Sequence, residues 1–238
     1  MTSLLELAGV ERRRGEGEGA FTLEVGELSL RAGDCLAVTG PSGSGKSTLL
    51  DLLGLVLCPD RAEVFRFLDR DVAALWRSGG DGGLAALRSR HLGYVLQTGG
   101  LLPFLDLREN VELSRRLLGL GPDSLTGELL ARLGLTHLKA KKPRALSVGE
   151  RQRAAIARAF AHRPALVLAD EPTAALDPSL ALEVCRLMRE LAAEFGIALV
   201  IVSHDWALVR RLRLPELRVV PQAGTSGCRS RLEGVSDA

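Results

Sequence analysis

Apolar and polar residues along this chain follow two periodicities, which predict strands and helices in alternation. Half-buried strands are indicated at 5–7 and 21–25, where apolar residues alternate with polar or small ones. Between them, the arginine- and glycine-rich segment 12–19 predicts a charged turn. Short, mainly apolar runs further along predict more buried strands, at 36–39, 64–68, 92–96, 165–169 and 197–202.

Helical spacing of apolar residues predicts several helices. One begins at 47, directly after a predicted strand and a glycine-rich loop, a second region fills 101–144, and a third stripe covers 180–191. Two stretches show neither periodicity. The glycine-rich segment 77–83 is typical of a mobile surface loop, and the polar tail 222–238 is typical of a disordered segment.

Composition narrows the classes of protein. With 238 residues the chain can form one large domain, or one domain with an inserted lobe. A formal net charge of +2 gives no argument for a nucleic-acid partner, and we expect none. No apolar run approaches the roughly 20 residues that span a bilayer, and no basic segment precedes an apolar one at the N-terminus, so we expect a cytoplasmic chain. The cysteines lack C-x-x-C spacing, which favours plain thiols over a metal site or disulfides.

The clearest chemical signal is a phosphate-binding loop. A strand-like run precedes it and a helix-like run follows it, which is the context that the pattern G-x-x-x-x-G-K-[ST] requires. The Lys46 ammonium would reach the β- and γ-phosphates of a nucleoside triphosphate, and the Ser47 hydroxyl would bind Mg²⁺. A chance match in a glycine-rich loop is the alternative. The predicted ATP-binding residues of this loop are Gly40, Pro41, Ser42, Gly43, Ser44, Gly45, Lys46, Ser47 and Thr48.

Strand, loop and helix in this order predict an α/β fold, the three-layer core of P-loop NTPases with a mainly parallel sheet. We expect an antiparallel β piece near the N-terminus, a core of about 1–97 and 146–220, and an inserted helical subdomain at about 98–145, all in a single domain spanning 1–238. The nucleotide would bind at the carboxyl ends of the strands.

Two adjacent carboxylates, Asp170 and Glu171, end the apolar run 165–169. Carboxylates at the end of a buried strand are costly unless they bind something. Asp170 would hold Mg²⁺ through its water shell, and Glu171 would act as general base toward the attacking water. The alternative is that both acids merely close the strand in solvent.

A second candidate phosphate site precedes the helix-like run 151–160. Ser147 and Glu150 fit a capping box, so a well-capped helix is one sufficient explanation. Capping does not require Gly149, however, and a helix start with a serine and a glycine is also a ready anion site.

These motifs, in their order and spacing, resemble the ATP-binding-cassette ATPases over about residues 3–220. The resemblance rests on the phosphate loop, Gln97, 146–150, 170–171, 174–177 and 203–205. Within that family, 92–97 followed by Leu101-Leu102-Pro103 and Glu109-Asn110-Val111 looks most like the lipoprotein-releasing, macrolide-export and cell-division branch.

The resemblance assigns roles to further residues. Gln97 would sense the γ-phosphate and Mg²⁺, and His204 would contact the γ-phosphate and hold the general base in line. Ser147 and Gly149 would bind ATP that is held by a second copy of the chain, and Asp177 would lie at the interface between the copies. The implied assembly is a head-to-tail homodimer with two-fold symmetry.

The chain departs from the family pattern at two sites. One is the family's signature segment, which corresponds to 146–150 here, and the other is the adenine site. Val148 stands where the signature usually has a first glycine. The aromatic residue that usually stacks on adenine is not apparent upstream of the phosphate loop. Arg14, whose guanidinium can stack on a base, and Phe21 are the two candidate substitutes.

The resemblance implies an Mg²⁺-dependent ATPase that powers a separate integral membrane permease from the inner face of the cell membrane, with ATP and Mg²⁺ as cofactors. Two other classes use related ATPases. One is mechanical signalling across the membrane, as in cell-division complexes that move no cargo. The other is a soluble cassette protein acting on DNA or ribosomes, whose usual coiled coils, paired cassettes or zinc modules are not visible in this sequence.

Overall fold

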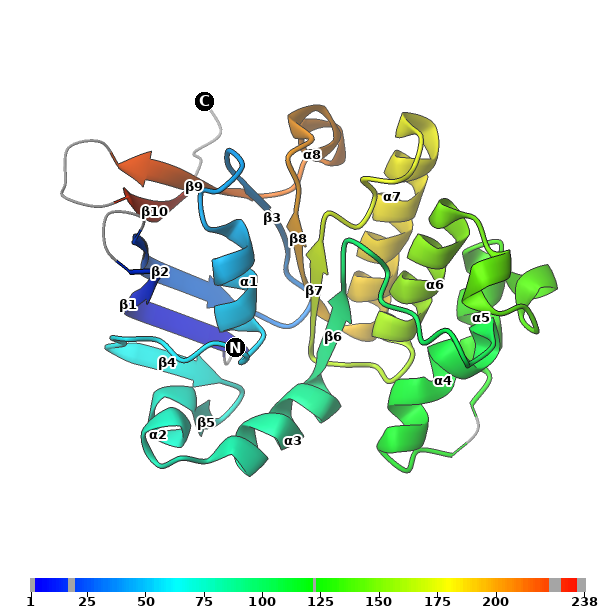
Figure 1. Ribbon diagram of the computed structural model, residues 1–238, viewed down its shortest axis with the longest axis horizontal. Coiled ribbons are helices and arrows are strands. Elements are labelled where there is room, and N and C mark those ends of the chain that lie inside the picture. The colour runs from blue at the N-terminus through cyan, green and yellow to red at the C-terminus, as the bar shows by residue number, and fades with distance from the viewer. Residues whose placement is uncertain (1–2, 17–19, 122, 223–227, 235–238) are drawn as a thin grey trace.

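One β-sheet runs through the whole fold, with helices packed on it (Figure 1). The computed structural model describes residues 3–16, 20–121, 123–222 and 228–234. Within these residues the sheet has 10 strands in the order β5-β4-β1-β2-β10-β9-β3-β8-β7-β6. The strands are β1 Leu5–Arg14, β2 Phe21–Leu30, β3 Cys35–Thr39, β4 Val64–Phe67, β5 Arg70–Asp71, β6 Leu92–Val95, β7 Leu166–Asp170, β8 Ala198–Val202, β9 Glu216–Gln222 and β10 Cys228–Gly234.

Several helix ends in the described residues coincide with capping residues. Ser147 and Glu150 form the predicted capping box at the start of α6, and Asp177 caps the start of α7. Gly196 ends α7 at φ 63°, in the left-handed region that glycine adopts easily. The helices are α1 Lys46–Leu53, α2 Val72–Arg77, α3 Asp81–His91, α4 Leu107–Leu117, α5 Leu125–Arg132, α6 Val148–Phe160, α7 Pro178–Phe195 and α8 Trp206–Leu212, with 3₁₀ segments at Thr136–Leu138 and Pro143–Ala145.

The sheet has a parallel part and an antiparallel part, as predicted. The strands β3, β8, β7 and β6 are parallel neighbours, and β7 and β8 are almost entirely buried. Because helices cover both faces there, these strands are continuous apolar runs. Near the N-terminus, β1 pairs antiparallel with β2 and β4, and its buried and partly exposed residues alternate in places.

Two main clusters of buried side chains lie on this framework. One joins α1, α2 and α3 to the antiparallel strands and to one face of the parallel strands, and it includes Phe65 and Phe67. The other joins α4, α5, α6 and α7 to the parallel strands and includes Ile156, Phe160 and Met188. Figure 1 shows the green helices α4 and α5 beside α6, on the far side of the parallel strands from α1. The helices predicted within 101–144 are therefore present, and α4 packs against α6.

Three predictions of irregular structure are wrong in part. Residues 12–14 of the predicted turn belong to β1, because they pair with 21–23 of β2. The segment 77–83 is mostly helical, since α2 ends at Arg77 and α3 begins at Asp81. In the tail, 228–234 form a strand between β2 and β9, so they are not disordered. Backbone hydrogen bonds to two neighbouring strands hold this polar segment in place. Other parts of the predicted turn and tail, at 17–19, 223–227 and 235–238, lie outside the described residues.

Within the described residues, no helix combines the length and apolar character needed to cross a membrane.

Candidate nucleotide site

The phosphate loop joins the end of β3 to the start of α1, as the sequence predicts, and backbone geometry explains its glycines. Gly40 has φ 149° and Gly45 has φ 105°, both in a region that L side chains rarely adopt. A Cβ on Gly40 would lie 2.6 Å from the carbonyl oxygen of Val219, and one on Gly45 would collide with the Phe21 ring. The loop can therefore take this course only with glycine at both positions.

Lys46 begins α1 and folds back over the loop. Its Nζ donates hydrogen bonds to the carbonyl oxygens of Gly40 and Pro41, both at 2.8 Å. These bonds hold the ammonium beside the N-terminus of α1, whose free N–H groups and positive dipole end favour an anion. A phosphate group at this position would meet both the cation and the backbone donors.

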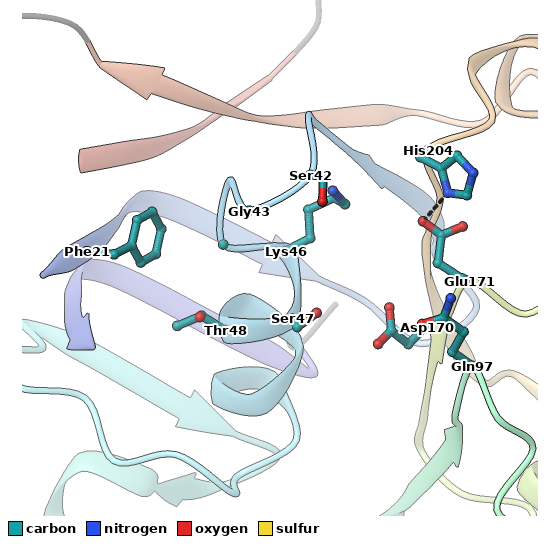
Figure 2. Close-up of a pocket in the computed structure, with 11 residues that line it drawn as sticks. Phe21, Ser42, Gly43, Lys46, Ser47, Thr48, Gln97, Asp170, Glu171 and His204 are labelled. Atoms are coloured by element: carbon teal, nitrogen blue, oxygen red, sulfur yellow. Dashed lines mark hydrogen bonds and ion pairs between the residues drawn. The ribbon is translucent and has the colours of Figure 1, made fainter. Parts of the chain in front are cut away.

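The loop borders a cavity of about 820 Å³. Figure 2 shows that its walls come from separate parts of the sequence: β2 and the phosphate loop on one side, the ends of β7 and β8 and the segment after β6 on the other. The Ser47 and Asp170 side chains point toward each other across it (Figure 2). The lining residues are Phe21, Ser42, Gly43, Gly45, Lys46, Ser47, Thr48, Gln97, Asp170, Glu171 and His204.

Glu171 and His204 are in direct contact on one wall of the cavity. Glu171 Oε1 lies 2.7 Å from His204 Nδ1. The Glu171 backbone has φ 47°, a region that is uncommon for non-glycine residues, and its N–H donates to the carbonyl oxygen of Val202 at 3.0 Å. Such unfavourable backbone conformations concentrate at functional sites, where surrounding contacts hold them in place.

Asp170 has a perturbed acidity. Burial raises the pKa of its carboxyl group, and the negative charges of Glu171 and Asp51 act in the same direction. The positive charge of Lys46 opposes them, but the net direction is upward. A bound cation would favour the ionised carboxylate, so this site gains from a positive ligand.

The donor set of the cavity fits Mg²⁺. The Ser47 hydroxyl, the Asp170 carboxylate and the Gln97 amide oxygen are hard oxygen donors of the kind that Mg²⁺ prefers. Among the described residues, no cluster of three or more His, Cys, Asp or Glu side chains could hold a metal ion by itself. That matches the usual Mg²⁺ site of a nucleotide enzyme, in which one or two protein oxygens act together with water and substrate phosphates.

The predicted signature residues lie away from this cavity. Ser147 and Gly149 are at the start of α6, and they do not line the cavity of their own chain. Val148 between them has 55% of its surface exposed. A Cβ on Gly149 would lie 2.9 Å from Leu176 Cδ2, so the signature packs directly against the segment that leads to Asp177.

Of the two candidates for the adenine site, the structure brings only Phe21 into the cavity. Arg14 instead forms an ion pair with Asp51, with 3.4 Å between Nη1 and Oδ2. Phe21 lies at the start of β2 and packs against Gly45 of the phosphate loop. The hydrophobic alternation of β2 is the only sequence signal that could have favoured Phe21 over Arg14.

Sequence reasoning missed how α6 holds the segment after Gln97. Arg158 Nη1 donates to the carbonyl oxygen of Gly100 at 2.7 Å, and Arg158 Nη2 donates to that of Gly99 at 2.9 Å. Gln152 Nε2 donates to the carbonyl oxygen of Leu96 at 3.3 Å. The helix α6, which begins at the signature, therefore holds the segment around Gln97 by hydrogen bonds to its backbone. No local pattern indicates this contact, because 58 residues separate Arg158 from Gly100.

A glycine-rich loop between a buried parallel strand and a helix, facing the acidic end of another parallel strand, defines a P-loop nucleoside triphosphatase. The family comparison is more specific, because the model of the ABC transporter family matches residues 23–174. The chain belongs to this family and is an ATP-binding ATPase component of an ABC transporter.

The most similar relatives include two kinds of protein. The lipoprotein-releasing system ATP-binding protein LolD of Idiomarina loihiensis is 41% identical over 204 residues, which cover 84% of this chain and 87% of LolD. The macrolide export ATP-binding/permease protein MacB of Marinobacter nauticus is 38% identical over 93% of this chain, but the match spans only 35% of MacB. This chain therefore spans about a third of the length of the MacB relatives.

Solved structures agree with this assignment. The dimeric ATP-binding cassette MJ0796 in a post-hydrolysis state with ADP and Pi superimposes with a TM-score of 0.81 and 30% sequence identity. The match covers 98% of this chain and 100% of that one. The predicted fold class and family are thereby confirmed.

Proposed function

We propose that this chain binds ATP with Mg²⁺ in the cavity beside the phosphate loop and hydrolyses it there. The observation that carries the proposal is the juxtaposition of Lys46, Ser47, Asp170, Glu171 and His204 around one cavity. Lys46 and the loop N–H groups would hold the β- and γ-phosphates. Ser47, Asp170 and Gln97 would hold Mg²⁺, which neutralises phosphate charge when bound.

Glu171 is the proposed general base. Its carboxylate ends a buried strand and faces the cavity from the side opposite Lys46 (Figure 2). The hydrogen bond to His204 would fix the orientation of the carboxylate. In that orientation Glu171 would accept a proton from a water molecule aligned with the γ-phosphate. His204 would also contact the γ-phosphate through its other ring nitrogen. Phosphoryl transfer needs little beyond such positioning and charge stabilisation.

The active assembly is a homodimer in this proposal. Ser147 and Gly149 lie outside the cavity of their own chain, while the exposed N-terminus of α6 is suited to a phosphate. In a head-to-tail dimer they would complete the site of the other copy, with Asp177 at the interface. The dimeric form of the MJ0796 cassette supports this arrangement.

The partner that ATP turnover drives would be an integral membrane permease. LolD is named as part of a lipoprotein-releasing system, and MacB carries its permease on the same chain. We assign this chain a peripheral place on the inner face of the membrane, with the permease held by a helical subdomain at about 98–145 and the ATPase core formed by about 1–97 and 146–220. Export or lipoprotein release is the transport mode that these relatives favour.

A complementation experiment tests the shared site. Lys46→Ala disables the phosphate loop, Ser147→Arg disables the signature, and each variant alone should lose ATP hydrolysis. A heterodimer of the two contains one site in which both halves are intact. Mixing the inactive variants should therefore restore hydrolysis, whereas a mixture that stays at the sum of the separate rates contradicts the shared site. Mixing two Lys46→Ala preparations is the control.

A further inference from the structure

A continuous series of side-chain contacts connects the strand before the phosphate loop to the helix after His204. Thr39, the fully buried last residue of β3, donates from Oγ1 to Glu216 Oε1 at 2.6 Å. The same carboxylate oxygen accepts from Arg218 Nη2 at 3.3 Å. The guanidinium carbon of Arg218 lies 4.6 Å from the centroid of the Trp206 ring.

Both ends of this series adjoin the candidate site. Thr39 directly precedes Gly40, where β9 comes so close that a Cβ would lie 2.6 Å from the carbonyl oxygen of Val219. Trp206 is the first residue of α8 and stands two residues after His204. The contacts therefore connect segments that adjoin the two walls of the nucleotide cavity.

Apart from its hydrogen bond to Glu171, His204 has little packing to orient it. Its side chain is 68% exposed. The buried face of α8, made by Leu208 and Leu212, packs with residues of α7, and Asp205 caps the start of the helix by accepting from the Leu208 N–H. The stacked Trp206 ring provides a contact from that start to β9 and hence to the phosphate loop.

Arg218 suits this position for a chemical reason. Its planar guanidinium can donate to a carboxylate with its edge and lie over an aromatic ring with its face at the same time. Glu216 supplies the carboxylate, with its side chain only 15% exposed, and Trp206 supplies the ring. A lysine would keep the charge but lose this combination.

We propose that Trp206 is a positioning residue for the hydrolysis step. Stacked on Arg218, it fixes the start of α8, and with it His204, relative to the phosphate loop. The proposal rests on the role of His204 in the proposed function. It concerns the rate of the chemical step, since Trp206 does not line the nucleotide cavity.

A double-mutant cycle in the full-length chain tests the proposal. Saturating kcat and the KM for ATP are measured for the parent, Trp206→Ala, His204→Ala and the double variant. Trp206→Ala should lower kcat by about three- to tenfold, in the range of a lost cation–π contact, with KM within about twofold. In the His204→Ala background it should lower kcat no further. Arg211→Ala, which removes an exposed arginine of the same helix, is the matched control.

The outcomes separate the inference from the function on which it rests. A His204→Ala variant with parental kcat would show that the proposed role of His204 is wrong. If His204→Ala loses turnover, but adding Trp206→Ala to that variant lowers its residual kcat by the same factor as in the parent, the inference alone is overturned. Should Trp206→Ala fold poorly, Arg218→Ala takes its place in the cycle, because Arg218 has a half-exposed side chain. Trp206→Phe should keep most of the rate, since a phenyl face also binds a cation.

Discussion

Glu171 Oε1 and His204 Nδ1 lie 2.7 Å apart although 33 residues separate them in the sequence. The two residues follow β7 and β8, which are parallel neighbours, so their side chains emerge at the same edge of the sheet. Glu171 is only 12% exposed, whereas His204 is 68% exposed. The histidine therefore contacts a mostly enclosed carboxylate from its solvent side.

Replacing the proposed general base should stop turnover but not ATP binding. In Glu171→Gln an amide cannot accept the proton of the attacking water, so kcat should fall by about 10²- to 10⁴-fold. The variant should also accumulate as an ATP-bound dimer, which size-exclusion chromatography can detect. Glu27→Gln changes an exposed glutamate of β2 and should leave both properties unchanged. Parental hydrolysis by Glu171→Gln would remove Glu171 from this role.

Removing the loop ammonium should weaken nucleotide binding. Lys46→Ala loses a charge-assisted contact worth about 1.5–3 kcal/mol, so the Kd for ATP should rise by about 10- to 150-fold. Isothermal titration calorimetry measures this directly. Lys142→Ala, at an exposed position of the same residue type, should bind ATP like the parent. Equal affinity in the parent and Lys46→Ala would exclude Lys46 from the site.

The adenine contact should depend on Phe21 and not on Arg14. Stacking of a base on an aromatic ring is worth about 1–3 kcal/mol, so Phe21→Ala should raise the Kd for ATP by about 5- to 150-fold, while Phe21→Tyr should not. Arg14→Ala should change the Kd by less than about twofold, since Arg14 pairs with Asp51 outside the cavity. The opposite ranking of Phe21→Ala and Arg14→Ala would assign the adenine site to Arg14.

Asp170 should make the ligand-free protein less stable as the pH rises. The pKa of its carboxyl group is raised in the folded state, so ionisation above pH of about 4 costs more in the folded than in the unfolded chain. Asp170→Asn should therefore have a larger free energy of unfolding than the parent at pH 7, and the difference should shrink toward pH 4. Urea unfolding at both pH values measures it.

The control for Asp170 is Asp69→Asn, because the Asp69 side chain is 90% exposed. That variant should follow the parent at both pH values. If Asp170→Asn were less stable than the parent at pH 7, the carboxylate would have a stabilising contact that the direction of its pKa contradicts. Asp170→Asn should also lose the stabilisation that Mg²⁺ and ATP together give to the parent, since one proposed metal ligand is missing.

The sequence by itself determined the features that depend on neighbours along the chain. The phosphate loop is one, because its glycines, Lys46 and Ser47 act within a single strand–loop–helix unit. The capping box of Ser147 and Glu150 is another, since both partners lie within one turn. The buried parallel strands were visible because their apolar runs reflect burial on both faces.

Only the tertiary structure decided which of these pieces meet. The pairing order β3-β8-β7-β6 places Asp170, Glu171 and His204 opposite Lys46, and no local pattern contains that order. The strand at 228–234 exists because β2 and β9 satisfy its backbone hydrogen bonds, although its polar composition favours disorder. The contact of Arg218 with Trp206 likewise joins a strand to a helix. Such relationships depend on hydrogen bonding and packing between distant segments, and these form only when the whole sheet assembles.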